Sequence, residues 1–545
     1  MNLPLRIFLS ILIGLALAFA FSIPFLNLLQ RSFLDQILLI LFTTAAFGYL
    51  VFTWLESRNE IFRPERQSKD GFADALRLQR TLALPSRTVG LAARTVAGSA
   101  RENRASAQRE GNFLNSLNVF NKKLHWSGTA FASFLHEHVP GLVLALAFII
   151  VYTYFGLQFN NPSIDTVDNY LDADNSSWMR RIALPDGYQM EMRGPHPFAY
   201  FIFRPLGWIF NLFTGNPAFT AILLNTLTGG LCVFLAWVFI KNQFQNRVYA
   251  FLIAALLGLS TSHLVLGSII ESYIFSAAAL IGFFLLLQTR KESTGSLVAL
   301  SLLTFGITLT NFVQNLIGFI VSRPRWKDVF HFGALVISLG VLLSLLHAVW
   351  YPSSKLFFLP SDAQTEEEFT ISVFHDPLWR AIGRVILLIR TILLYSVVAP
   401  HPYVFTKEVG GAFPRFNFFK ISPETYRFSS YSGLGNILIF AWVALLLVAG
   451  VFFIRNIIRT HKADLSLAFG LCLLFNFVLH LNYGYEPFLY SPDWAYALIF
   501  FVAFGLAPLA NYRWFRVGLF AFLVLLAFNQ WQFLKFVLDT ISPFL

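Results

Sequence analysis

The feature that most constrains this chain is a series of apolar runs that recurs along the whole sequence. Each run is about 20 residues long, the length at which an α-helix crosses the hydrocarbon core of a bilayer. Of the 545 residues, 56% are hydrophobic and only 13% are charged, about half the charged fraction of a typical soluble domain. We therefore expect an all-α, polytopic transmembrane protein. A soluble globule, a disordered chain, a nucleic-acid module and an outer-membrane barrel of short alternating strands are excluded.

Positive charge is concentrated in one segment. Residues 57–125 contain 13 Lys and Arg against six Asp and Glu, within a net charge of +11 for the chain. Because Lys-rich and Arg-rich loops stay on the cytoplasmic side, we expect this segment inside, beside anionic lipid headgroups. The predicted division is an N-terminal transmembrane hairpin (1–56), a basic cytoplasmic segment (57–138) and a transmembrane core (139–545).

The Lys and Arg residues at the ends of the apolar runs set the predicted topology. They give about 13 spans, with the N-terminus inside and the C-terminus outside. If the apolar segments 198–213 and 379–399 also crossed the membrane, the basic loops after them would fall on the outer side. We therefore expect both segments to lie along the outer surface, and Pro205 to interrupt the first. The long loops of the core then lie outside, at 159–197, 352–378 and 400–435.

The first outer loop is rich in carboxylates, namely Asp165, Asp168, Asp172 and Asp174. Carboxylates directly after a span supply a general base or a cation ligand, or form a solvated acidic loop. An EF-hand is excluded, because its central Gly and its twelfth-position Glu are missing. Transporters place such groups near the midplane between similar halves, and this chain has no half-to-half repeat. The pattern favours an enzyme that acts outside on a lipid-linked substrate.

Three short motifs follow this loop in order: Gly194-Pro-His-Pro-Phe-Ala-Tyr200, then Ser268-Ile-Ile-Glu-Ser-Tyr273, then Leu309-Thr-Asn311 between two short helices. Their order and spacing resemble the membrane-embedded glycosyltransferases of the GT-C superfamily. The nearest likeness is to the protein O-mannosyltransferase and lipid A aminoarabinose transferase branch. The resemblance covers 139–322, and elsewhere it extends to topology alone.

The motifs depart from the family pattern at three places. Phe198 replaces the second proline of His-Pro-Pro, and Glu271-Ser-Tyr273 is one residue shorter than Glu-x-x-Tyr. Asp174-Asn175 stands where the family has Asp-Glu. The N-terminal hairpin and the basic segment are not part of the common core.

The resemblance implies an inverting glycosyltransferase of the bacterial cytoplasmic membrane, acting on the cell envelope with its active site outside. It would move a sugar from a polyprenyl-phosphate donor to a glycan, lipid or protein acceptor, in contact with membrane lipids and without nucleic acid. The resemblance implies no certain cofactor besides this donor substrate, and it leaves open whether a divalent cation is required. Two other hypotheses stay open: a transporter or flippase of lipid-linked sugars, and a non-catalytic membrane assembly factor.

Within this hypothesis, an acidic residue of the first outer loop takes the proton of the acceptor hydroxyl. Asp174 is the first choice and Asp172 the second, with Asp168 and Asp165 as rivals. A helical turn that starts near Asp174 would place it on one face with Trp178, an aromatic wall suited to a sugar.

The donor phosphate needs cations, and three arginines share one sector of an apolar helix: Arg380, Arg384 and Arg390. We expect them to bind the leaving phosphate, with snorkelling to lipid headgroups as the alternative.

Five further residues are predicted to contact the substrate: Asp168, His196, Glu271, Tyr490 and Asp493. His196 is expected mainly to fix its loop, and Glu271 either contacts substrate or pairs with an arginine such as Arg193. Tyr490 and Asp493 belong to an aromatic element that lines the sugar or lipid site or forms an interfacial belt.

Overall fold

The computed structural model describes most of the chain, namely residues 3–29, 32–61, 128–289, 294–371, 373–405, 413–460 and 464–545. Residues 62–127, most of the basic segment, lie outside these residues, so its cytoplasmic placement stays a prediction. Contacts divide the chain into two units, with residues 54–139 in one and residues 2–53 and 140–545 in the other. The fold and the site described below belong to the second unit.

The N-terminal hairpin consists of α1 (Leu3–Leu29) and α2 (Phe33–Ile61). The two helices approach closely where Gly14 faces Gly48, because a Cβ on Gly14 would lie 2.7 Å from the Gly48 backbone. Small residues at such a crossing are typical of helix pairs in membranes. Leu39 of α2 packs with Leu345 of α14 (Trp326–Trp350), so the hairpin is attached to the core.

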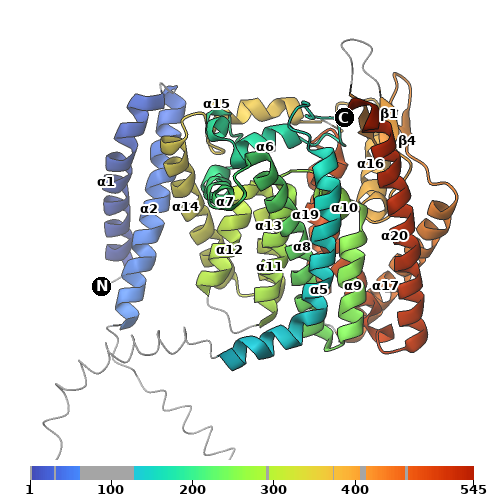
Figure 1. Cartoon of the computed structure of the whole chain (residues 1–545). Helices are drawn as coiled ribbons and strands as arrows, with labels where there is room; N and C mark the ends of the chain where they lie inside the picture. Colours follow the sequence, from blue (N-terminus) through green and yellow to red (C-terminus); the bar gives the residue numbers. More distant parts are fainter. Residues whose placement is uncertain are drawn as a thin grey trace, which may run out of the picture. The chain divides into compact units, whose positions relative to one another are not determined.

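The core is a helical bundle whose members run side by side in Figure 1. Its helices are α5 (Gly128–Phe159), α8 (Pro217–Phe244), α9 (Arg247–Leu259), α10 (Thr261–Leu266), α11 (Tyr273–Thr289), α12 (Thr294–Ile307), α13 (Phe312–Ser322), α14, α17 (Leu434–Thr460), α18 (Leu465–Leu481), α19 (Pro492–Leu506) and α20 (Arg513–Ile541). Helix α11 packs against α8, α12, α13 and α19, and most of its side chains are buried. It therefore stands at the centre of the bundle.

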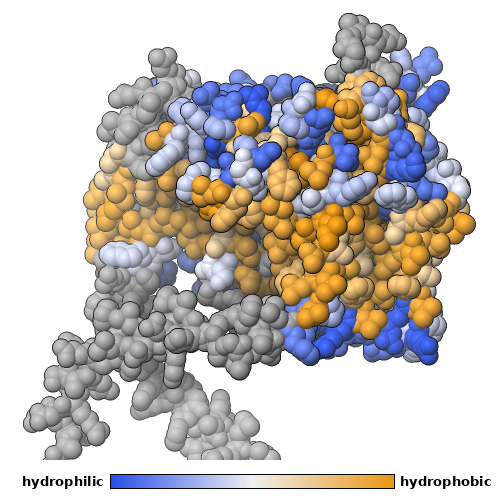
Figure 2. Space-filling view, in the orientation of Figure 1, coloured by the Kyte–Doolittle hydropathy of each residue, from blue (hydrophilic) through white to orange (hydrophobic). Residues whose placement is uncertain are grey.

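Seven helices of the described chain are long and apolar enough to cross a membrane: Leu34–Glu56, His136–Phe159, Pro217–Phe244, Trp326–Trp350, Leu434–Arg459, Pro492–Leu509 and Arg513–Phe544. Shorter apolar helices coincide with the remaining predicted spans. Figure 2 shows, over the core helices, an apolar band between two hydrophilic margins. The chain is a multi-pass helical membrane protein, and the count of 13 crossings stays a prediction.

The two apolar segments expected on the surface form α7 (Ala199–Thr214) and α16 (Leu378–Arg390), which continues as a π-helical turn over Thr391–Tyr395. Figure 1 shows α7 end-on, whereas α5 and α20 are seen from the side, so α7 lies across the bundle. The expectation that Pro205 interrupts this helix is wrong, because α7 runs through it. Proline removes a single backbone donor, and packing against α6 (Asn175–Ala183) and α8 holds the rest of the helix.

The expectation of an all-α chain is correct except in the loop 400–435. There β1 (Tyr403–Phe405) pairs with β2 (Arg415–Asn417), and β3 (Phe419–Ile421) pairs with β4 (Tyr426–Phe428), both antiparallel. This loop is rich in aromatic residues, which favour short strands. The strands matter here because β2 reaches the acidic loop.

Candidate functional site

The acidic loop between α5 and α6 is held in an unusual backbone conformation. Asp168, Leu171 and Asp172 have φ angles of 60°, 56° and 61°, in the left-handed region that disfavours residues with a side chain. Two backbone hydrogen bonds hold the turn against β2: Leu171 N–H donates to the Phe416 carbonyl (2.9 Å), and Phe416 N–H donates to Asn169 (2.8 Å). Strain of this kind persists only where the surroundings impose it, and it gathers at functional sites.

The strand contact brings a cation to the loop. Arg415 of β2 forms an ion pair with Asp172. Burial nevertheless raises the pKa of Asp172, and the Arg415 charge opposes this rise. Asp172, the second choice for the base, is therefore already engaged by an arginine.

Asp174 occupies the residue before α6, as predicted from the turn. The Trp178 N–H donates to the Asp174 carbonyl (2.8 Å), while the Asp174 carboxylate makes no capping hydrogen bond to the helix. Asp174 and Trp178 line the same cavity. Burial, followed by the negative charge of Asp168, raises the pKa of Asp174.

Glu271 lies in the loop between α10 and α11 and is only 1% exposed. Its carboxylate accepts two backbone hydrogen bonds, from Asp174 N–H (2.9 Å) and Ser272 N–H (2.8 Å). Burial, and then the charge of Asp174, raise its pKa to about 8. The alternative that Glu271 pairs with Arg193 is wrong, because Arg193 binds Glu366 instead.

These groups enclose a cavity of about 420 Å³, which we call the acidic cavity. Its ionisable lining consists of Asp168, Asp172, Asp174, Glu271, Glu486, Arg181, Arg193, Arg415 and His196. The aromatic lining includes Trp178, Tyr273 and Tyr490. The structure therefore brings together Asp168, Asp172 and Asp174 of the acidic loop with His196, Glu271 and Tyr490, as the sequence predicted. Asp165, the remaining carboxylate considered for the base, lines a different pocket.

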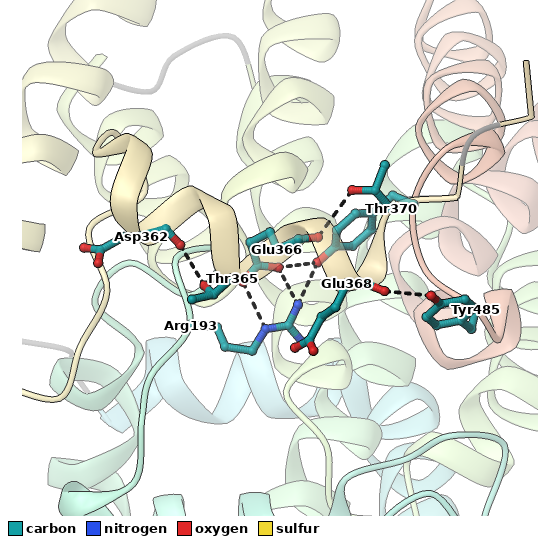
Figure 3. A network of polar contacts seen from close by, with 8 residues as sticks. Arg193, Asp362, Thr365, Glu366, Glu368, Thr370 and Tyr485 are labelled. Atoms are coloured by element: carbon teal, nitrogen blue, oxygen red, sulfur yellow. Dashed lines mark hydrogen bonds and ion pairs between the residues drawn. The ribbon is translucent and has the colours of Figure 1, made fainter. Parts of the chain in front are cut away.

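Arg193 lies at one wall of the acidic cavity, beneath a segment that we call the strap (residues 360–371). The strap consists of α15 (Pro360–Ala363), the 3-10 helix η3 (Gln364–Phe369) and two further residues. Figure 3 shows the Arg193 guanidinium facing the Glu366 carboxylate of the strap. Arg193 also donates to the Tyr483 hydroxyl (3.1 Å) and lies 3.6 Å from the centre of the Phe369 ring.

The strap is attached at its far end to the loop after α18. Gly484 N–H donates to the Phe369 carbonyl (2.9 Å), and Ile371 N–H donates to the Asn482 carbonyl (2.9 Å). The Tyr485 hydroxyl donates to the Glu368 backbone carbonyl (2.7 Å). Backbone and side-chain contacts therefore fix the strap along the cavity.

The three predicted phosphate ligands do not line this cavity, so the expected convergence is wrong. Arg384 is buried and donates to the carbonyls of His480, Tyr483, Gly484 and Tyr485. Its charge is thus used to hold the loop after α18.

The other two arginines of α16 also have partners elsewhere. Arg380 pairs with Asp376 (3.3 Å). Arg390 donates to the Tyr395 hydroxyl (2.7 Å) and to the Ser429 carbonyl (2.8 Å). The shared helical sector was correct, but that sector faces protein backbone and local partners.

Sequence reasoning missed four contributors to the site: Arg181, Arg415, Glu366 and Glu486. Glu486 is 2% exposed, and one of its carboxylate oxygens is buried without a hydrogen-bond partner in the described part of the chain. Burial, followed by the charge of Asp172, raises its pKa to about 8. The signal for Glu486 was its place in the late aromatic element, four residues before Tyr490.

His196 joins its loop to the turn between α12 and α13, which matches its predicted structural role. Its Nδ1 lies 2.5 Å from the Ile307 carbonyl, and the Pro195 carbonyl accepts a hydrogen bond from Leu309 N–H (2.8 Å). Burial lowers the pKa of His196 to about 3, so the imidazole is neutral at physiological pH. The His196 and Trp178 rings pack edge to face, with 5.3 Å between their centres.

A second cavity, of about 170 Å³, adjoins the first. Arg193, His196, Tyr273 and Tyr490 line both. Asp493, at the start of α19, lines only the second cavity. Among the described residues, no group of three or more His, Cys, Asp or Glu side chains is placed to hold a metal ion.

A scan against protein-family models matches none, and a search of curated proteins also finds no match.

Proposed function

We propose that this protein is a GT-C-like, inverting glycosyltransferase that moves a sugar from a polyprenyl-phosphate donor to an acceptor on the extracytoplasmic face. The observation that carries the proposal is the acidic cavity. In it Asp174, held by Glu271, lies beside the Trp178 ring and near three arginines. The carboxylates come from loops and helix ends next to the apolar helices, where a lipid-linked donor and a polar acceptor meet.

The reaction follows from these groups. Asp174 accepts the proton of the acceptor hydroxyl while the hydroxyl oxygen forms a bond to the anomeric carbon. The bond from that carbon to the phosphate oxygen breaks on the opposite face, and its electron pair goes to the departing polyprenyl phosphate. The configuration of the anomeric carbon is inverted. Burial and the charge that each carboxylate exerts on the other raise the pKa of both Asp174 and Glu271, which makes them stronger bases than exposed carboxylates.

Arg181 is the cation best placed to receive the phosphate. Its guanidinium lies 5.3 Å from the Trp178 ring centre and donates to the Glu191 carbonyl (3.3 Å). Arg193 and Arg415 already pair with Glu366 and Asp172, so a phosphate must compete with those carboxylates. Charge-assisted hydrogen bonds from arginine stabilise the charge that gathers on a leaving phosphate.

The two rival hypotheses account for fewer of these features. A transporter places its ionisable groups near the middle of broken helices, whereas the carboxylates here lie in loops and at helix ends. Carboxylates with raised pKa values gather at functional sites, and three of them line this one cavity, which favours an enzyme over a non-catalytic assembly factor.

The proposal is tested with the full chain in lipid nanodiscs and a panel of radiolabelled polyprenyl-phosphate sugars, offered with a membrane extract as acceptor source. We expect label to pass from at least one donor to a product that no longer partitions with the polyprenyl lipid. Proteoliposomes loaded with the same donors test the alternative. Movement of intact donor between leaflets, with no transfer, would contradict the proposal and favour a flippase.

A further inference from the structure

The second cavity contains an arrangement that the proposed chemistry does not use. Two of its lining side chains, Thr308 and Asp493, are 6% and 3% exposed. The Thr308 hydroxyl oxygen and one Asp493 carboxylate oxygen are buried and have no hydrogen-bond partner within the ranges that the structure describes. Nearly all buried polar atoms in native proteins have a partner. A ligand that brings hydrogen-bonding groups would satisfy both.

The fold holds these two side chains in place. Thr308 directly follows α12, and Asp493 lies in the first turn of α19. The Asp493 side chain also hydrogen-bonds with Asn311 and Ser276. These contacts hold its carboxyl group at the cavity wall.

The rest of the cavity wall is largely apolar and aromatic. Leu309, Phe357 and Leu479 contribute aliphatic and aromatic surface, and the rings of Tyr273 and Tyr490 pack edge to face at 5.1 Å. Carbohydrate rings combine hydroxyl groups with C–H faces that pack on such surfaces. Arg193 also lines this cavity but is paired with Glu366, and a phosphate here would meet the Asp493 carboxylate, whose charge repels it.

We propose that the second cavity is the sugar pocket, in which Asp493 and Thr308 bind hydroxyl or amino groups of the transferred sugar and so determine which sugar is accepted. This inference rests on the proposed function. The sugar then reaches Asp174 across the wall that both cavities share, and its phosphate lies in the acidic cavity near Arg181. A pocket built to bind a hydroxyl group rejects an analogue that lacks it far more strongly than an apolar pocket discriminates by size.

The experiment compares binding of bare polyprenyl phosphate with binding of polyprenyl-phosphate sugars, for the full chain in nanodiscs. In the wild type, at least one sugar should tighten binding beyond the bare lipid phosphate. The sugar-dependent gain is the ratio of the affinity for the polyprenyl-phosphate sugar to the affinity for bare polyprenyl phosphate. This ratio should fall by roughly 10- to 100-fold in Asp493→Asn and by less in Thr308→Val. The affinity for bare polyprenyl phosphate should stay unchanged in both, which also shows that the variants fold.

Matched controls are Asp186→Asn, an exposed carboxylate on the first outer loop, and Thr228→Val, whose hydroxyl bonds within α8 (2.8 Å). Both should keep the sugar-dependent gain. The sugar-pocket proposal is refuted if no sugar tightens binding to the wild type, or if Asp493→Asn and Thr308→Val keep the sugar-dependent gain.

The two proposals fail separately. Sugar-dependent binding that is lost in the variants, with no transfer by the wild type, refutes the transferase and keeps the pocket. Transfer by the wild type with unchanged donor KM and sugar preference in the variants refutes the pocket alone.

Discussion

The backbone N–H of Asp174 donates a hydrogen bond of 2.9 Å to the carboxylate of Glu271, 97 residues further along the chain. This bond joins the start of α6 to the loop before α11, so the expected base is positioned by the second motif. Because Glu271 also accepts the Ser272 N–H, its carboxyl fixes both loops at once.

We therefore expect Glu271→Gln to reduce transfer at least about tenfold, while donor binding persists. An amide retains one acceptor oxygen, so one of the two backbone donors loses its partner and Asp174 is less well placed. The kcat and KM values of transfer measure this: kcat should fall and KM should change little. A rise in KM alone would mean that Glu271 binds substrate and does not position Asp174.

The raised pKa of Glu486 predicts a pH dependence of stability. Its pKa rises from the ordinary 4.5 to about 8 in the folded protein, so the folded state binds more protons than the unfolded state between these values. Its contribution to stability is therefore fully present below pH 4.5 and is lost as the pH rises through 8. Thermal unfolding in detergent should show a midpoint that falls more steeply from pH 5 to 8.5 in the wild type than in Glu486→Gln. Parallel curves would refute this assignment.

The Arg193–Glu366 pair predicts a change in anion affinity. Glu366→Gln removes the carboxylate that competes for Arg193, so polyprenyl phosphate should bind several-fold more tightly, by roughly 0.5–1 kcal/mol. The matched control is Glu191→Gln, which removes an exposed carboxylate that pairs with Lys355 (3.6 Å). Equal affinities in the wild type and Glu366→Gln would mean that the phosphate does not use Arg193.

Arg384 is predicted to act on stability. Its guanidinium donates to the His480 carbonyl in the last turn of α18 and to three carbonyls of the loop that follows, a fork geometry that lysine cannot reproduce. Both Arg384→Met and Arg384→Lys should cost at least about 2 kcal/mol in the free energy of unfolding. The half-exposed Arg380 is the control, and Arg380→Met should have little effect on thermal unfolding. A stable Arg384→Met variant with weakened donor binding would restore the original phosphate role.

Much of this arrangement was predictable from the sequence, because the constraints were local. Apolar run lengths located the helices, and the four-residue spacing of Asp174 and Trp178 gave their common face. The periodicity of the α16 arginines showed that they share a sector, but it did not show what that sector faces. Arg415 reaches Asp172 through a strand pairing between segments 243 residues apart, and no local pattern encodes that contact.

The central claim is that Asp174 is the base of a sugar transfer, and the most direct measurement is the transfer rate of Asp174→Asn beside Asp172→Asn. The account predicts that Asp174→Asn loses roughly 10²–10⁴-fold in rate while polyprenyl-phosphate binding persists. Asp172→Asn, which weakens the Arg415 pair, should lose less. Near-normal transfer by Asp174→Asn with an inactive Asp172→Asn would move the role to Asp172, and normal transfer by both would contradict the account.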